Sequence, residues 1–310
     1  MDLRKDLRNG PAGRRMRWAS GFVLAGILAL GLAACGTSSG GGNTGANCPD
    51  TSKLHLVSSG KLTIASDTTY APAEFEDPNK PGSYIGYDLD LAKELAARMC
   101  LTPVIQKADF SAIIPDISGP ALGTQKYDAS FSSFTINNDR LAKVDMIPYF
   151  QAGEAIMVAK GNPKNIKAIK DMCGLVVAVQ DGTVEKDELD DANGNGPGNS
   201  GQEPVCKDNH IRVYHNSDQG LVTRQVVTGS ADAMYADEPI VGYAVSQNAG
   251  KVESAGNNVA PSPQGIVVRN DNADLETAMK TALKAMITDG KYQEILKKWG
   301  VDSGAYTTGV

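Results

Sequence analysis

Residues 128–140 read Asp-Ala-Ser-Phe-Ser-Ser-Phe-Thr-Ile-Asn-Asn-Asp-Arg, and they begin inside a strand-like segment, Tyr127–Phe131. Small polar residues follow, and the stretch ends at Arg140, whose planar guanidinium can take a carboxylate through two parallel hydrogen bonds. Ser133 and Thr135 precede this arginine and can add hydroxyl or backbone donors. The stretch therefore combines a strand of the expected core with a candidate anion-binding group.

Strand-like and helix-like segments alternate on both sides of this stretch. Asp88–Met99 has helical spacing, because Leu91 and Leu95 lie one turn apart and carboxylates stand at its start. Leu175–Val179 is a continuous apolar run, as in strands buried on both faces. The alternation predicts an α/β fold with mainly parallel sheets. The other expected strands and helices are Leu62–Ala65, Val104–Ile105, Ile266–Val268, Leu275–Met286 before Gly290, and Tyr292–Trp299 before Gly300.

The net charge argues against nucleic-acid binding. The chain of 310 residues has 30 Lys and Arg against 36 Asp and Glu, and beyond residue 34 the balance is 24 against 34. A surface with that excess of negative charge repels phosphate backbones. The three histidines, His55, His210 and His215, lack the spacing of a helical zinc site, so we expect no metal and no cofactor.

Residues 1–34 are interpreted as a signal peptide, because a basic stretch is followed by the apolar run Trp18–Leu32, which is short for a bilayer span. The run ends in Leu-Ala-Ala-Cys, which resembles the lipobox of bacterial lipoproteins and makes Cys35 the expected lipidation site. The alternative is an ordinary secretory signal with a coincidental cysteine. Residues 35–54 begin with a Gly/Ser-rich stretch and are interpreted as a flexible tether. We therefore expect an extracytoplasmic protein anchored to the cell membrane by lipid.

Four cysteines remain if Cys35 carries lipid, namely Cys48, Cys100, Cys173 and Cys206. An exported chain meets oxidising conditions, so an even number of cysteines favours two disulfides. Three pairings exist, and proximity in sequence favours Cys173 with Cys206 and Cys48 with Cys100. The alternative is buried free thiols.

No catalytic constellation is visible in the sequence, which lacks a Gly-x-Ser-x-Gly elbow, a phosphate-cradling loop and a His-Glu-x-x-His motif. Residues 191–202 begin Asp-x-Asn-x-Asn-Gly, as in an EF-hand calcium loop, but they close on Gln202 instead of a glutamate. Asn and Gly are also the usual residues of turns. We therefore interpret the segment as an exposed loop.

Six segments in a fixed order carry the strongest functional signal. They are Asp67–Phe75 (Asp-Thr-Thr-Tyr-Ala-Pro-Ala-Glu-Phe), Gly86–Ala92 (Gly-Tyr-Asp-Leu-Asp-Leu-Ala), Phe110–Pro115 (Phe-Ser-Ala-Ile-Ile-Pro), residues 128–140, Val179–Thr183 (Val-Gln-Asp-Gly-Thr) and Asp232–Asp237 (Asp-Ala-Met-Tyr-Ala-Asp). Together they resemble the family 3 extracellular solute-binding proteins of ABC transporters, which bind polar amino acids. The resemblance extends from about Lys61 to Trp299.

This resemblance implies a clamshell of the periplasmic-binding-protein type, whose two lobes close around a ligand. Lobe 1 would hold residues 55–152 and 263–310, and lobe 2 would hold residues 153–262, with two hinge strands between them. We expect a monomeric protein, not an enzyme, that captures an amino acid with high affinity. A cationic or amide side chain is favoured. The protein would then deliver the ligand to the permease subunits of an ABC importer.

The resemblance also implies the ligand-binding residues. Arg140 and Thr183 would bind the α-carboxylate, Asp237 would bind the α-ammonium, and Tyr70 and Phe110 would wall the aliphatic part. Residue types alone also fit a surface position for Arg140, a helix cap for Asp237 before a first-turn proline, and core positions for the two aromatic residues. The full expected set is Asp67, Tyr70, Phe110, Ser132, Ser133, Thr135, Arg140, Gln180, Thr183 and Asp237, with Asp67 and Gln180 near the ligand's side chain.

Two other functions fit the same fold. A dehydratase-like enzyme needs a positioned general acid in the cleft, and Asp181 and Glu185 are near enough in sequence to supply one. A ligand-sensing lipoprotein would present its ligand to a receptor instead of a permease. Glu74, Asp88 and Asp90 are expected to serve structure and not to contact ligand.

Overall fold

The computed structural model describes residues 48–196, 204–256 and 259–308. The expected signal peptide, the lipidation site Cys35 and the first part of the expected tether lie outside these residues. The last part of that tether is attached to the folded unit, because Leu54 is buried in the core and Cys48 forms a disulfide. Within the described ranges, no helix has the length and apolar character that crossing a membrane requires.

The first sheet has five strands in the order β5-β1-β6-β13-β7. Their bounds are β1 Lys61–Ser66, β5 Thr102–Lys107, β6 Ala129–Ser130, β7 Asp145–Ala152 and β13 Ser262–Val268. β1 pairs in parallel with β5 and β6, whereas β13 runs antiparallel to β6 and β7. Every residue of β1 after Lys61 is buried, as expected for a strand covered on both faces.

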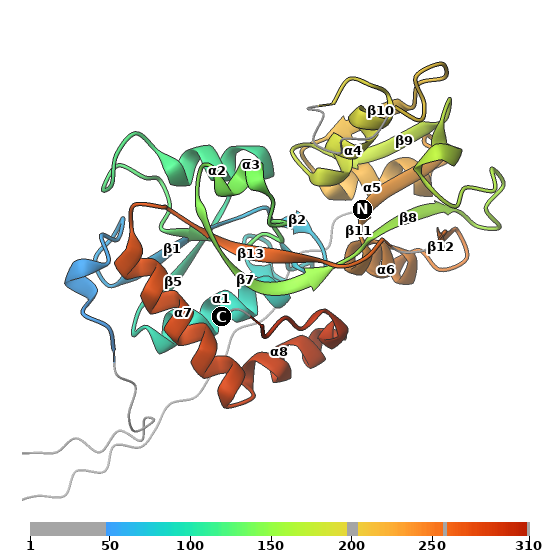
Figure 1. Ribbon diagram of the computed structural model, residues 1–310. Helices are drawn as coiled ribbons and strands as arrows, with labels where there is room; N and C mark the ends of the chain where they lie inside the picture. Colours follow the sequence, from blue (N-terminus) through green and yellow to red (C-terminus); the bar gives the residue numbers. More distant parts are fainter. Residues whose placement is uncertain (1–47, 197–203, 257–258, 309–310) are drawn as a thin grey trace, which may run out of the picture. The chain divides into compact units, whose positions relative to one another are not determined.

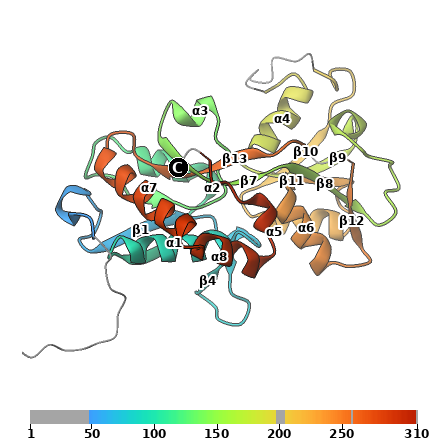
Figure 2. The same cartoon turned by 60° about the horizontal axis from the view of Figure 1, so that its bottom comes forward.

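Helices cover both faces of the first sheet (Figure 1). Leu62 and Ile64 of β1 pack with helices α1 (Tyr87–Arg98) and α7 (Ala273–Thr288), and the next residue, Ala65, packs on the other face with α2 (Phe110–Ser118). The alternation follows from the two-residue period of a strand. Figure 2 shows α1, α7 and α8 (Lys291–Trp299) side by side.

The second sheet has five strands in the order β10-β9-β11-β8-β12. Their bounds are β8 Glu154–Ala159, β9 Val176–Gln180, β10 Arg212–Asn216, β11 Ala233–Asp237 and β12 Val252–Ala255. β9 is parallel to β10 and β11, and β8 is antiparallel to β11 and β12. The helices of this part are α4 Val184–Ala192, α5 Gln219–Val227 and α6 Glu238–Gln247 (Figure 1).

Shorter elements complete the described chain. A small sheet contains β2, β3 and β4, with α3 and three short 3-10 helices elsewhere. Their bounds are β2 Thr69–Tyr70, β3 Glu74–Glu76, β4 Tyr84–Ile85, α3 Asn138–Leu141, η1 Thr51–Lys53, η2 Ile169–Met172 and η3 Asp302–Gly304. The sequence predicted both C-terminal helices, and Gly290 and Gly300 adopt the left-handed conformation where these helices end or begin.

The chain crosses between the two sheets twice, which gives the fold two lobes. β7 continues into β8 through Gly153, and the chain returns from β12 to β13. A Cβ atom on Gly153 would lie 2.3 Å from the carbonyl oxygen of Val259, so a glycine is needed where the two crossings pass each other. The Val259 amide donates to the carbonyl of Glu154 at 3.0 Å. The strands at these crossings are antiparallel to their neighbours, a detail that the alternation of strands and helices does not specify.

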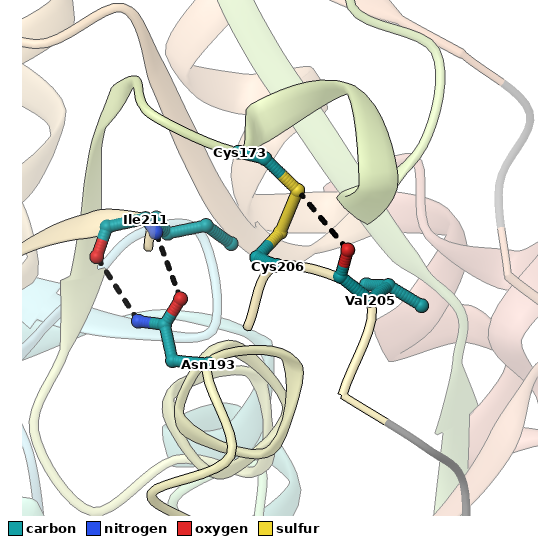
Figure 3. Close-up of a disulfide and its surroundings, with 5 residues drawn as sticks. All are labelled: Cys173, Asn193, Val205, Cys206 and Ile211. Carbon is teal, nitrogen blue, oxygen red and sulfur yellow. Dashed lines mark hydrogen bonds between the residues drawn. A yellow bond between two sulfur atoms is a disulfide. The ribbon is translucent and has the colours of Figure 1, made fainter. Parts of the chain in front are cut away.

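The structure contains two disulfides, Cys48–Cys100 and Cys173–Cys206, which are the pairs that proximity in sequence favoured. Figure 3 shows that the second one lies beside the end of α4. There the side chain of Asn193 accepts from the amide of Ile211 at 2.7 Å and donates to its carbonyl at 3.0 Å. The amide pair therefore fastens the end of α4 to the start of β10, and the disulfide ties the segment before β9 to the chain that follows α4.

Candidate functional site

A small, partly enclosed space lies between the two sheets. Its walls come from β2, the start of α2, the segment after β6 and α3 on one side, and from the ends of β9 and β11 and the start of α4 on the other. Ligand sites of α/β proteins commonly lie at such carboxyl ends of strands. The lining residues are Tyr70, Phe110, Ser133, Thr135, Arg140, Gln180, Thr183, Val184, Glu185 and Asp237.

Arg140 is buried, so its interpretation as a surface residue is wrong. The side chain of Asn137 caps α3 by accepting from the Arg140 amide at 2.9 Å. The guanidinium donates to the carbonyl of Thr135 at 2.7 Å and to that of Gly182 at 3.1 Å. Because Gly182 follows the second sheet's β9, this contact joins the two lobes.

Aromatic rings support the guanidinium of Arg140. Its central carbon lies 5.5 Å from the ring centre of Phe110 and 5.1 Å from that of Phe134, and the two rings stack 4.1 Å apart. Such contacts attract a cation to the face of the ring. Burial lowers the pKa of Arg140, and the nearby carboxyl of Glu185 opposes this shift. Arginine nevertheless stays protonated in proteins, so the space contains a fixed positive charge.

Asp237 stands at the N-terminus of α6, but its carboxylate does not cap that helix. Instead it accepts from the hydroxyl of Tyr70 at 2.9 Å and from the side-chain amide of Gln264 at 3.0 Å. The interpretation as a simple helix cap is therefore wrong. Burial raises the pKa of this carboxyl to about 7. Tyr70 lies in the first lobe and Asp237 in the second, so this pair also bridges the lobes.

Eight of the ten expected residues line the space, and Asp67 and Ser132 do not. The carboxylate of Asp67 accepts from the side-chain amide of Gln180, which itself lines the space, and from the hydroxyl of Thr69. Ser132 accepts from the amide of Asp67 at 2.9 Å and donates to Glu74 at 2.8 Å. Both residues thus lie behind the lining. Burial raises the pKa of Asp67 to about 6.

Thr183 caps α4. Its hydroxyl accepts from the Lys186 amide at 3.3 Å and donates to the carbonyl of Gln180 at 2.9 Å. The first turn of α4 therefore borders the same space as Arg140, and the start of a helix has amide groups without partners inside the helix.

Glu74 and Asp88 are buried structural groups, as expected, and they fix the turn that carries Ser133. Asp88 accepts from the Ser133 amide at 2.9 Å and from the Tyr149 hydroxyl at 2.6 Å. Ser133 has φ = 51°, which is uncommon for a residue with a side chain. The bonds to Asp88 hold that conformation. Asp90 bonds instead to Lys298 and Trp299 of α8, away from the cavity.

The expected set omitted Val184 and Glu185, which complete the lining. The sequence did contain a signal for Glu185, because it lies in the first turn of the helix that Thr183 caps. Of the two acids considered for an enzyme, only Glu185 lines the space. Asp181 instead pairs with the exposed His215 at 2.8 Å.

Within the described ranges, no three His, Cys, Asp or Glu side chains are grouped as metal ligands. Of the calcium-like segment, residues 197–202 lie outside the described chain. The described part forms turns: the amide of Asn195 donates to the carbonyl of Asp190 at 2.9 Å.

The sequence matches the family model of the bacterial extracellular solute-binding proteins, family 3, over residues 62–302. An arginine-binding protein of Corynebacterium glutamicum is 31% identical over 254 residues, covering 80% of this chain and 77% of that protein. A lysine/arginine/ornithine-binding periplasmic protein of Escherichia coli is 30% identical, covering 77% and 86%. A glutamine-binding ABC transporter protein of Bacillus subtilis is 25% identical, covering 86% and 91%.

The similar solved structures are also amino-acid-binding proteins. An ancestral arginine-binding protein bound to arginine superposes with a TM-score of 0.69 at 31% identity, covering 78% of this chain and 98% of its own. An ancestral amino-acid-binding protein described as a precursor of cyclohexadienyl dehydratase superposes with a TM-score of 0.65 at 30% identity, covering 77% and 95%.

Proposed function

This chain belongs to the bacterial extracellular solute-binding proteins of family 3, and we propose that it captures a polar amino acid and delivers it to an ABC importer. The similar proteins named for arginine, for lysine, arginine and ornithine, and for glutamine support an amino-acid ligand with a cationic or amide side chain. The observation that carries the proposal is the enclosed space in which Arg140 and Asp237, from different lobes, offer opposite charges.

In the proposed clamp, Arg140 binds the α-carboxylate and Asp237 binds the α-ammonium. Ser133, Thr135 and the start of α4 at Thr183 add donors for the carboxylate. This assignment gives each charged group of the ligand a protein group of opposite charge. An amino acid that loses water on binding needs such a partner for both its carboxylate and its ammonium.

The ligand's aliphatic part packs against Tyr70 and Phe110 in this proposal, and Gln180 lies toward its side chain. Asp67 acts on the side chain through Gln180, with which it is hydrogen-bonded. Ser132 positions the neighbouring turn through its bonds to Asp67 and Glu74 and makes no ligand contact.

The lobes in this proposal hold residues 55–152 with 263–310, and residues 153–262. They would open by rotation about the two crossings near Gly153, and the ligand would bridge them in the closed form. The hydrogen bonds from Arg140 to Gly182 and from Tyr70 to Asp237 support a closed arrangement of this kind, since both run between the lobes.

Isothermal calorimetry on the mature chain tests this function directly. The panel contains arginine, lysine, ornithine, histidine and glutamine, with succinate and glucose as ligands that lack an α-amino group. Binding of at least one amino acid, with no heat from succinate or glucose, supports the proposal. A chain that binds none of the amino acids would contradict it.

Acidification should weaken amino-acid binding. Burial raises the pKa of Asp237 to about 7 in the ligand-free protein, and an ammonium needs the ionised carboxylate. Below that pKa each binding event must release a proton, so Kd should rise by up to about tenfold per pH unit. Calorimetry in buffers of different ionisation enthalpy measures both Kd and the protons released. A Kd that is constant between about pH 5 and pH 8 would contradict the role of Asp237.

The same shift should make the ligand-free protein less stable as the pH rises. The native carboxyl of Asp237 keeps its proton at pH values where the unfolded one has lost it. Its contribution to stability is therefore present at low pH and is lost as the pH rises through about 7. Added ligand should reverse that loss, because it binds only the folded state.

Lipid anchoring is part of the proposal, and replacing Cys35 with alanine should release the protein into the soluble fraction. A signal peptide that is cut without lipidation leaves no acyl chain to hold the domain at the membrane. Fractionation of cells with an antibody against the folded unit measures the shift. Ser38→Ala, which leaves Cys35 and both disulfides in place, serves as the control, and a Cys35 variant that stays membrane-bound would contradict the anchor.

An enzyme of the dehydratase type is the second candidate, and one observation favours it. Glu185 is a buried carboxyl group that lines the space and has a raised pKa, as a general acid requires. A spectrophotometric turnover assay with prephenate separates the two functions, because a binding protein leaves the substrate unchanged. A sensing role is separated by testing whether importer-driven uptake depends on the protein.

A further inference from the structure

Glu185 has an unusual position for a carboxyl group. Its side chain is only 3% exposed, it lines the same enclosed space as Arg140 and Asp237, and its Oε1 atom has no hydrogen-bond partner among the described residues. A buried carboxylate oxygen without a hydrogen-bond partner carries an uncompensated cost of desolvation. Such a group is expected to have its partner in another state of the protein, for example when a ligand is bound.

The acidic neighbours of Glu185 have partners of their own. Glu154 and Glu188 share the hydroxyl of Tyr235, which lies within hydrogen-bond distance of both carboxyl groups, and Asp237 accepts from Tyr70 and Gln264. Glu185 therefore cannot be explained as one more member of a satisfied acidic cluster.

A second acceptor beside it is also unpaired. The Nε2 atom of Gln180 donates to the carboxylate of Asp67 and, at 2.9 Å, to the carbonyl of Ser217. Both partners are acceptors, so they fix the orientation of the amide and leave its Oε1 atom as the free end. This oxygen is buried without a partner, and Gln180 lines the space. The lining therefore contains two unpaired acceptors, from Glu185 and Gln180.

The charges of the lining do not balance. Arg140 is its one cationic side chain among the described lining residues, and it faces two carboxyl groups, Asp237 and Glu185. The α-carboxylate of an amino acid would neutralise Arg140, and the α-ammonium would neutralise Asp237. Glu185 would remain. Burial, followed by the charge of Asp237, raises the pKa of Glu185, although the guanidinium of Arg140 lies in the same lining.

We propose that Glu185 is a ligand-binding residue that pairs with a second positive charge on the ligand, so that the site selects amino acids with a cationic side chain over those with an amide. This inference rests on the proposed function and narrows its substrate class. A guanidinium or ammonium group supplies only donors, which suits the two unpaired acceptors. A glutamine side chain would supply a further acceptor oxygen and leave the charge of Glu185 without a partner.

The first test compares arginine with citrulline on the unmodified mature chain by calorimetry. The two ligands have nearly the same shape, but citrulline has a neutral urea group in place of the guanidinium. We expect arginine to bind at least about tenfold more tightly than citrulline, which corresponds to one lost charge pair at the lower end of the usual range. This comparison does not depend on the folding of any variant.

The second test uses Glu185→Gln, which keeps the shape of the side chain and removes its charge. It should weaken arginine binding by about 10- to 100-fold and change citrulline binding by less than about threefold. Glu185→Asp retains the charge and should recover part of the preference. Asp187→Asn is the matched control, because it removes the same charge from an exposed position of the same helix and should leave the preference unchanged.

The outcomes separate this inference from the function on which it rests. If the unmodified chain binds amino acids but holds citrulline or glutamine as tightly as arginine, the inference is wrong and the proposed function stands. An unchanged ratio of arginine to citrulline affinity in Glu185→Gln would also overturn it. A chain that binds no amino acid would overturn the function itself and this inference with it.

Discussion

Replacing Arg140 with alanine should weaken amino-acid binding by roughly 30-fold to several thousand-fold, which corresponds to about 2–5 kcal/mol. The substitution would leave the ligand's carboxylate in a buried space without its cation. The cost is large because the guanidinium is itself held in place, by the carbonyls of Thr135 and Gly182 and by the rings of Phe110 and Phe134. Calorimetry with the tightest-binding amino acid of the panel measures the change.

Matched variants distinguish the loss of the charge pair between Arg140 and the ligand from a general loss of folded protein. Arg224→Ala removes an exposed guanidinium from α5 and should leave affinity unchanged. Arg140→Lys keeps the positive charge but loses the planar fork, so it should recover only part of the affinity. Asp237→Ala should reduce amino-acid affinity by a similar factor to Arg140→Ala, since it removes the proposed partner of the α-ammonium. Affinity near that of the unmodified protein in both Arg140→Ala and Asp237→Ala would contradict the clamp.

The fold could be predicted from the sequence because its signals are local. The apolar run that became β9 and the helical spacing of α1 depend only on neighbouring residues. The pairing of strands across the two crossings could not be predicted in this way. It depends on contacts such as the one between Gly153 and Val259, which lie more than one hundred positions apart.

Residues of the candidate site could be predicted when they lie at the end of a strand. Gln180 and Asp237 end β9 and β11, and both line the space. Asp67 follows β1 in the same way but points into a hydrogen-bond network behind the lining, because Gln180 lies in front of it. Sequence position alone could not distinguish a side chain that lines the space from one that lies behind the lining, since the difference depends on how the two lobes meet.

Glu185 is the converse case, because it was not among the expected ligand-binding residues but does line the space. In the sequence it is one acidic residue among several in α4, a helix whose sequence would suit an exposed position. The sequence marked it as a possible general acid, but its place in the lining beside Arg140 and Asp237 follows only from where the capped start of α4 lies in the fold. Its burial is therefore a property of the assembled lobes and not of the helix.

Removing the Cys173–Cys206 disulfide should lower the free energy of unfolding by about 3–4 kcal/mol while leaving amino-acid affinity nearly unchanged. The bond joins residues 33 positions apart, and without it the unfolded chain gains the conformational freedom of that loop. The closed loop contains β9 and the whole of α4, but the disulfide itself lies near the end of α4, whereas the ligand would meet the start of that helix. That start keeps its own support, because Thr183 caps it and Asn193 still holds the far end to Ile211.

Urea unfolding of the Cys173→Ser, Cys206→Ser double variant measures the loss, and the double change avoids leaving a reactive single thiol. Calorimetry on the same variant at a temperature well below its melting point checks that affinity is kept. The Cys48–Cys100 bond is intact in both proteins, so the two proteins differ only in the Cys173–Cys206 bond. An unchanged urea midpoint, or free thiols at both positions in the exported protein, would contradict the prediction. A large loss of affinity at full folding would instead mean that the loop positions the ligand-facing end of α4.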